Sequence, residues 1–160
     1  MTDFAGLIRA LADSEVGFVL VRGVAATLHG SARLTQDVDV VYARDAENLS
    51  RLARALAPLR PYLRGAPPGL PFTLDERALA AGLNFTLTTS AGDIDLLGEI
   101  AGAGNYEALN GHTIEVELFG TRCQCLDLPT LIAAKIASGR PKDLEAIAEL
   151  RALIEERRGA

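Results

Sequence analysis

The sequence predicts an α+β domain, α/β-like in its first part, in which helices flank a mixed β-sheet and the C-terminus is helical. Three observations indicate this class. Helical and strand-like patterns alternate up to residue 56, two candidate β-hairpins follow, and the chain ends in helical patterns. Such an order is typical of α+β and α/β domains. We expect the 160 residues to form one domain, 1–160, because two domains would each be small for independent folding.

The first part of the chain alternates between helical and strand periodicity. Phe4, Leu7, Ile8 and Leu11 recur at helical spacing and predict a helix that ends between residues 14 and 17. The continuous apolar run 18–21 is typical of a central strand covered on both faces. We then expect a break at Gly23, a short helix over 24–29 closed by Gly30, a strand over 38–42 and a helix over 46–56.

The second part contains a proline-rich segment, two hairpins and two helices. Residues 58–71 hold five prolines and two glycines and predict a loop without regular structure. The stretches 84–89 and 94–97 predict a hairpin turned at 90–93, and 114–118 and 121–126 predict a second one turned at Phe119-Gly120. Helices are expected over 128–138 and 142–157, with a break at Gly139-Arg140-Pro141.

Composition excludes several functional classes. A net charge of −5 and a low aromatic content, 5% with no Trp, disfavour broad adhesion to nucleic acid, base-stacking platforms and anionic membranes. The N-terminus lacks the layout of a secretory signal, and no apolar run is long enough to span a bilayer, so we expect a cytoplasmic protein without a membrane partner. Cys123 and Cys125 are expected to be ordinary strand residues.

Two Asp-x-Asp pairs carry the chemistry. Side chains two apart on a strand point the same way, so Asp37 and Asp39 present two carboxylates on one face. Their mutual repulsion is relieved by a divalent cation such as Mg²⁺ or Mn²⁺, which prefers oxygen ligands. A second pair stands at Asp93 and Asp95, and three carboxylates converge if the two strands are neighbours. An isolated Asp-x-Asp, however, also often ends a strand and faces solvent.

A glycine turn precedes the first aspartate pair. The buried strand 18–21 leads through Arg22 and Gly23 into a helix N-terminus, where backbone N–H groups and the helix dipole favour phosphate. By itself a glycine turn is a weak signal. Its place upstream of an acidic strand makes it informative.

These pieces, taken together, resemble the DNA polymerase β nucleotidyltransferase superfamily, and within it the small bacterial nucleotidyltransferase-like proteins related to the AbiEii toxins. The resemblance extends from about residue 18 to residue 150, and its specificity comes from the order and spacing of the motifs. The matching stretches are VRGVAATLHG at 21–30, Arg33, Thr35, Asp37 and Asp39, GLNFT at 82–86, GDIDLL at 92–97, and 131–143 with Lys135 and GRPKD at 139–143.

The resemblance implies a nucleotidyltransferase fold and a role for each matching residue. Asp37, Asp39 and Asp95 would hold the metal ions, and Asp95 would also activate an acceptor hydroxyl, whereas Asp93 is expected in the turn. The residues implied at the nucleotide are Arg22, Gly23, Arg33, Thr35, Lys135, Arg140 and Asp143. Arg33 and Thr35 would either contact the nucleotide or anchor the turn, and Asp143 would orient Lys135 or Arg140.

The implied activity is metal-dependent transfer of a nucleoside monophosphate from an NTP to a hydroxyl. The acceptor would be an RNA such as tRNA, a protein or a small molecule, and the toxin-like relatives imply a toxin–antitoxin component with a cognate antitoxin. The alternative is a non-catalytic nucleotide- or partner-binding module that keeps the fold. Arg22 bears on this choice because the family usually has a small residue there, so this cation either grips phosphate or blocks the approach of the backbone.

The remaining candidates have plainer interpretations. His29 stands before a glycine at a helix end, and we expect it to serve the C-terminal cap rather than catalysis. Arg51, Arg54, Arg60 and Arg64 form the densest basic stretch, which is either a solvated helix face or an RNA-contacting edge.

Overall fold

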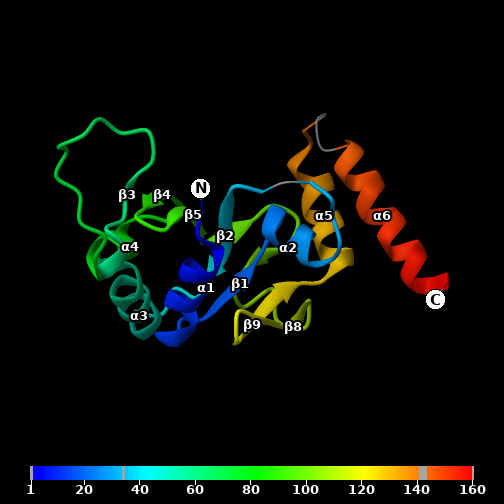
Figure 1. Cartoon of the computed structure of the whole chain (residues 1–160), viewed down its shortest axis with the longest axis horizontal. Coiled ribbons are helices and arrows are strands. Elements are labelled where there is room, and N and C mark those ends of the chain that lie inside the picture. The colour runs from blue at the N-terminus through cyan, green and yellow to red at the C-terminus, as the bar shows by residue number, and fades with distance from the viewer. Residues whose placement is uncertain (1, 34, 141–143, 160) are drawn as a thin grey trace.

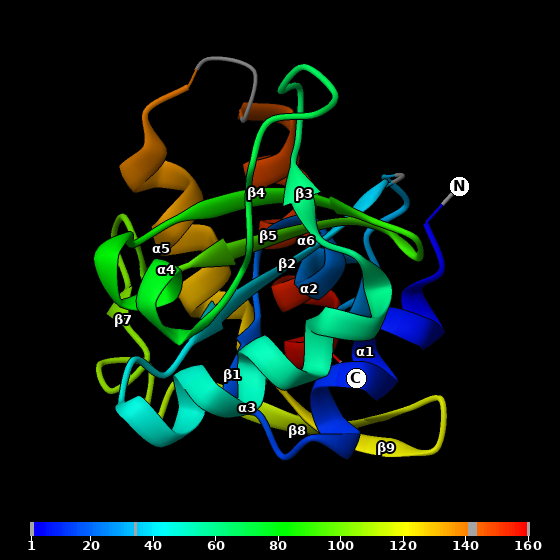
Figure 2. The same ribbon diagram turned by 90° about the vertical axis from the view of Figure 1, so that its left-hand side faces the viewer.

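A mixed seven-stranded sheet forms the centre of the computed structural model, which describes residues 2–33, 35–140 and 144–159. The strand order is β3-β4-β5-β2-β1-β9-β8, and Figures 1 and 2 show these strands side by side. β2 pairs with β5, and β1 with β9, in parallel; the other pairs are antiparallel. The strands are β1 Phe18–Leu20, β2 Asp37–Tyr42, β3 Tyr62–Leu63, β4 Phe85–Thr89, β5 Gly92–Leu97, β8 Thr113–Leu118 and β9 Thr121–Leu126, with β6 Glu99–Ile100 and β7 Gly104–Asn105 in a separate pair.

Four of the described helices begin at aspartate caps. The side chains of Asp3, Asp45, Asp75 and Asp127 each accept a hydrogen bond from a backbone N–H in the first turn of the helix that follows. Such caps satisfy amide groups that have no partner within the helix. The helices are α1 Phe4–Asp13, α2 Arg22–Leu28, α3 Ala46–Leu56, α4 Glu76–Ala81, α5 Leu128–Ser138 and α6 Leu144–Gly159, with a 3₁₀ turn, η1, at Ala57–Leu59.

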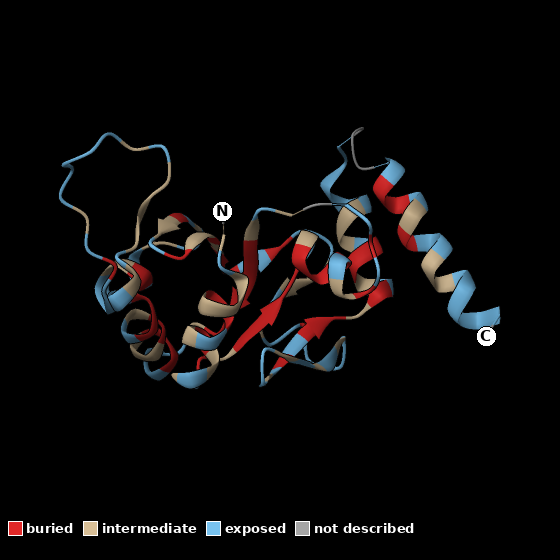
Figure 3. Cartoon of the chain, in the orientation of Figure 1, coloured by how far each residue is buried: buried red, intermediate tan, exposed pale blue. Residues whose placement is uncertain are grey.

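The main core lies between the sheet and the pair α1 and α3. Leu7 and Leu11 of α1 and Leu52 of α3 are fully buried, as are Val38 and Val40 on β2. Figure 3 shows the buried residues running through the central strands, while the outer side of α6 stays exposed. Because β2 alternates, burying Val38 and Val40 against α1 leaves the odd-numbered residues of this strand on the other face. This is the face that carries the aspartates.

His29 connects the C-terminal helix to the sheet. It is the C-cap residue of α2, as the sequence predicts, and its side chain is buried. Its Nε2 lies 2.8 Å from the Leu126 carbonyl oxygen and its Nδ1 lies 3.0 Å from Nη1 of Arg157 on α6, while Nη2 of Arg157 donates to the His29 carbonyl. Ser31 adds a 2.6 Å bond to Glu149. α6 is thereby held against α2 and α5.

Several sequence predictions agree with the structure and three are wrong. The α+β architecture is confirmed, α3 and α5 have their predicted bounds, and Cys123 and Cys125 are buried residues of β9. The proline-rich segment is not free of regular structure: Tyr62–Leu63 forms the edge strand β3, which tolerates nearby prolines because one side needs no partner. α2 begins two residues earlier than predicted, at Arg22. Asp93 lies in β5, not in the turn.

No described helix is long and apolar enough to cross a membrane.

Candidate functional site

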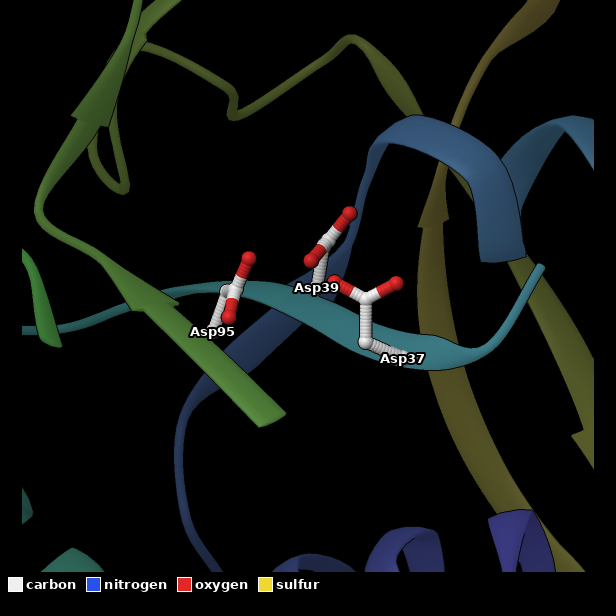
Figure 4. A group of neighbouring side chains, drawn as sticks. All are labelled: Asp37, Asp39 and Asp95. Atoms are coloured by element: carbon white, nitrogen blue, oxygen red, sulfur yellow. The ribbon is translucent and has the colours of Figure 1, made fainter. Parts of the chain in front are cut away.

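The register between β2 and β5 brings the two aspartate pairs together. These parallel neighbours align Asp37 with Asp93 and Asp39 with Asp95. Since side chains alternate along a strand, all four stand on the face opposite Val38 and Val40. Figure 4 shows Asp37, Asp39 and Asp95 on one side of the two strands, with their carboxylates turned toward one another. Two strands that are far apart in sequence thus build one acidic face.

Three of these side chains form a carboxylate cluster: Asp37, Asp39 and Asp95. One oxygen from each lies within 4.8 Å of the others. Asp39 is only 6% exposed. Oδ1 of Asp39 is buried and has no hydrogen-bond partner among the described residues. Oδ1 of Asp95 is buried as well, and Nη2 of Arg64 lies 2.8 Å from it as an ion-pair partner. Buried polar atoms normally have partners, and a buried carboxylate oxygen without one, close to two further carboxylates, is suited to a divalent cation. The donor set therefore fits Mg²⁺ or Mn²⁺.

Burial makes the charged form of this cluster costly. Burial, and then the charges of Asp37 and Asp95, raises the pKa of Asp39 to about 8, while the nearby Arg22 charge acts in the opposite direction. Burial, and then the charge of Asp95, also raises the pKa of Asp37. Without a cation, the cluster therefore retains a proton near neutral pH. A bound divalent ion would replace that proton and favour full ionisation.

Arg64 is the cluster's direct cationic neighbour, and sequence reasoning missed it. Its guanidinium lies 2.8 Å from Asp95 Oδ1, 3.4 Å from Asp93 Oδ2 and 4.0 Å from Asp37 Oδ2. The sequence offered two interpretations, a solvated helix face or an RNA-contacting edge. The helix face is wrong for Arg64, because this residue follows β3 and contacts the aspartates, and the RNA-contacting edge stays a prediction. The available signal was the pair Tyr62 and Leu63, two good strand formers between prolines.

A second cationic region lies at the start of α2. Arg22, Lys135 and Arg140 line a cavity of about 220 Å³ together with apolar side chains that include Leu126 and Leu131. Arg22 adopts a φ of 56°, a left-handed conformation that is uncommon for residues other than glycine. The cavity thus gathers three of the residues implied at the nucleotide. Its cations and apolar walls suit a phosphorylated ligand with an apolar part.

Gly23, Thr35 and Arg33 have structural contacts that explain their residue types. A Cβ on Gly23 would lie 3.0 Å from Oγ1 of Thr35, so glycine permits the close packing of α2 against the segment before β2. Thr35 Oγ1 also donates to the Asp37 carbonyl. Arg33 forms ion pairs of 3.4 and 3.9 Å with Glu145 and Glu149 of α6, which corresponds to the anchoring alternative. Asp143 lies outside the described residues.

Comparison with known proteins supports the fold. No protein-family model matches the chain, and no curated protein matches it. Among solved structures, the chain is similar to a Thermotoga maritima protein named a "putative nucleotidyltransferase", with 17% sequence identity and a TM-score of 0.57 over 98% of this chain and 96% of that one. The predicted nucleotidyltransferase fold is therefore confirmed. At this identity the likeness concerns the fold alone.

Proposed function

We propose that the protein is a metal-dependent nucleotidyltransferase that moves a nucleoside monophosphate from an NTP to a hydroxyl group. The observation that carries the proposal is the carboxylate cluster: one oxygen from each of three carboxylates lies within 4.8 Å of the others, and Oδ1 of Asp39 is buried without a hydrogen-bond partner among the described residues. The nucleotidyltransferase fold and the cationic cavity beside Arg22 support it. We further propose that residues 1–160 act as one domain in the cytoplasm.

Each group in the site has a place in this reaction. Asp37, Asp39 and Asp95 would hold Mg²⁺ or Mn²⁺, which neutralises negative charge that develops on the phosphoryl oxygens. Arg22, Lys135 and Arg140 bind the triphosphate, because Arg and Lys are the usual phosphate ligands. The acceptor oxygen forms a bond to the α-phosphorus, the bond from the α-phosphorus to the bridging oxygen breaks, and pyrophosphate leaves. Asp95 accepts the proton of the acceptor hydroxyl.

A larger cavity beside Asp93 suits the acceptor. It measures about 660 Å³ and contains no Lys or Arg among its described lining residues. Neutral hydroxyl groups supply most of its polar lining, and they can hydrogen-bond an acceptor without the cations that a nucleic-acid backbone requires. The lining hydroxyls belong to Thr2, Thr35, Thr88, Thr89 and Ser90. A protein side chain or a small molecule is thus favoured over tRNA, and the protein target would suit a toxin-like component controlled by a cognate antitoxin.

One observation favours a second function, a non-catalytic nucleotide- or partner-binding module. Arg64 already neutralises part of the cluster through its ion pairs with Asp95 and Asp37. An internal cation of this kind is also what a degenerate site would use to stabilise its carboxylates without metal. The two functions differ in their need for the buried Asp39. Binding of an NTP alone would tolerate its loss, whereas transfer would not.

Label transfer tests the proposal. The wild-type chain is incubated with each NTP labelled at the α-phosphate, with Mg²⁺ or Mn²⁺, and with cell-lysate protein, bulk tRNA or a small-molecule fraction. Asp39→Asn is the test variant and Asp13→Asn, an exposed aspartate at the end of α1, is the matched control. We expect transfer by wild type and Asp13→Asn but not by Asp39→Asn. Transfer that persists in Asp39→Asn contradicts the carboxylate assignment, and NTP binding without transfer by wild type identifies the non-catalytic module.

A further inference from the structure

Arg64 lies in the same cross-strand row as two residues of the carboxylate cluster. Its backbone N–H donates to the Thr86 carbonyl, which continues the β3–β4 ladder by one residue. Thr86 pairs with Asp95, and Asp95 pairs with Asp39. Residues opposite one another in neighbouring strands share a face. The edge of the sheet therefore places an arginine over the aspartates, although 25 or more residues separate it from each of them in sequence.

The Arg64 side chain is held by the sheet itself. Nη2 donates 2.7 Å to the Leu87 carbonyl and 3.4 Å to the Ile94 carbonyl. The adjoining chain is fixed as well: the Tyr62 hydroxyl donates to the Pro67 carbonyl and accepts from the Leu70 N–H. The Tyr62 ring also packs edge-on against Phe72. The guanidinium is thus a positioned group, not an exposed side chain that reaches the cluster by chance.

The contacts of Arg64 divide the acidic face into two sides. Arg64 contacts Asp95, Asp93 and Asp37, and its side chain is 29% exposed. Asp39 is 6% exposed, its Oδ1 has no hydrogen-bond partner among the described residues, and it forms no ion pair with Arg64 within 4.0 Å. A Mg²⁺ ion bound to Asp95 would need to lie about 2.0–2.1 Å from one of its oxygens. Nη2 of Arg64, 2.8 Å from Asp95 Oδ1, already lies beside one of these two oxygens.

We propose that Arg64 is a built-in cation of this site, so that the cluster binds one divalent ion on the Asp39 side while the guanidinium supplies the second positive charge on the Asp95 side. The inference rests on the proposed metal site. A two-metal centre needs ions about 3.5–4 Å apart, and one of the two positions is taken by Arg64. The guanidinium offsets part of the negative charge of the acidic face whether or not a nucleotide is present.

The number of bound ions tests this proposal. Binding of Mn²⁺ alone to the full chain is followed by titration calorimetry and by the electron paramagnetic resonance signal of free Mn²⁺. We expect one ion per chain for wild type and for Arg64→Lys, which keeps the charge. For Arg64→Gln we expect a second ion, with first-site affinity increased about tenfold or more because a nearby positive charge is removed. Arg77→Gln, which removes an exposed arginine of α4, is the matched control and should bind as wild type does.

The outcomes separate this proposal from the proposed function. Two ions bound to wild type would show that Arg64 yields its position, and would overturn the inference while leaving the metal site intact. One bound ion with the same affinity in wild type and in Arg64→Gln would also overturn the inference and leave the metal site intact. No Mn²⁺ bound to any variant would instead refute the metal site. Thermal unfolding checks that each variant is folded. If Arg64→Gln is not folded, the number of ions bound to wild type and to Arg64→Lys still decides the test.

Discussion

The two sides of the carboxylate cluster differ in what the chain offers them. On the Asp95 side, Arg64 lies within 2.8 Å and is held by two carbonyl groups of the sheet. On the Asp39 side, a buried oxygen has no partner among the described residues, and the nearest cationic influence is the charge of Arg22, which also lines the cavity at the start of α2. One side is neutralised internally, and the other is left for a ligand.

With the proposed metal site, this difference would let one acidic face be stable and still bind a divalent ion. Four carboxylates on adjacent strands repel one another, and a fold that left all of them unpaired would lose stability. A cation at one edge reduces that repulsion. In the proposed arrangement, the carboxylates farthest from Arg64 are left to the divalent ion.

The largest expected effect separates Asp37 from its register partner Asp93. Both contact Arg64, but Asp37 belongs to the cluster of three oxygens and Asp93 does not. We expect Asp37→Asn to reduce label transfer by about 10³-fold, because it removes a metal ligand. Asp93→Asn should reduce it less than about fivefold, because it removes one exposed ion pair. Equal losses in the two variants would mean that Asp93 is a ligand and that the cluster is larger than three residues.

A charge reversal at Arg64 should lower the stability of the metal-free protein. Arg64→Glu places another carboxylate among Asp37, Asp93 and Asp95, so we expect the free energy of unfolding of the metal-free protein to fall by about 2–3 kcal/mol, below the range for fully buried pairs because Arg64 is partly exposed. Urea denaturation in the presence of EDTA measures this loss. Arg77→Glu, on the exposed face of α4, is the control and should lie within about 0.5 kcal/mol of wild type. A similar loss in both variants would argue against a specific role for Arg64.

The sequence predicted one side of the site better than the other, for a physical reason. Asp37 and Asp39 are two apart in a strand, so the alternation of side chains along a strand predicted that they share one face. The fold class followed from the order of helical and strand patterns. No local pattern in the sequence indicates that β2 pairs with β5 in parallel. The sequence therefore predicted that Asp95 meets the first aspartate pair only if the two strands are neighbours.

Arg64 depended on long-range pairing that local patterns do not encode. It follows a two-residue edge strand within a proline-rich segment, where turn signals dominate. Its place over the aspartates is set by the β3–β4–β5–β2 order, which only the assembled sheet shows. The contact between His29 and Arg157 has the same origin, because it joins residues 128 positions apart. Residue type and spacing predicted the candidate metal ligands, whereas only the tertiary structure shows which residues surround them.

The difference in the pH dependence of stability between wild type and Asp39→Asn should report the Asp39 carboxyl. The pKa of Asp39 is about 8 in the folded chain and close to its ordinary value of 3.8 when unfolded, so the folded state holds a proton that the unfolded state has lost between these values. Stability therefore falls as pH rises through this window, with a slope of at most about 1.4 kcal/mol per pH unit. Between pH 6 and 8 in EDTA, we expect wild type to lose about 1–2 kcal/mol relative to Asp39→Asn. Parallel pH profiles for the two proteins, measured by urea denaturation, would place the shifted group elsewhere.

The smallest expected effect concerns Arg22, where the sequence left two possibilities open. Arg22 lines the cavity with Lys135 and Arg140, which favours a grip on phosphate over obstruction. Glycine adopts the observed φ of 56° without cost, so Arg22→Gly should change the free energy of unfolding by less than about 1 kcal/mol. It should weaken ATP binding about tenfold in calorimetry with Mg²⁺, because a charge-assisted phosphate contact is lost. Tighter ATP binding in Arg22→Gly would show instead that the arginine obstructs the site.

Arg64→Gln should leave ATP affinity nearly unchanged, since the guanidinium of Arg64 faces Asp95 and not this cavity. If Arg64→Gln changes Mn²⁺ binding but not ATP binding, and Arg22→Gly changes ATP binding, the two sides of the cluster bind different ligands.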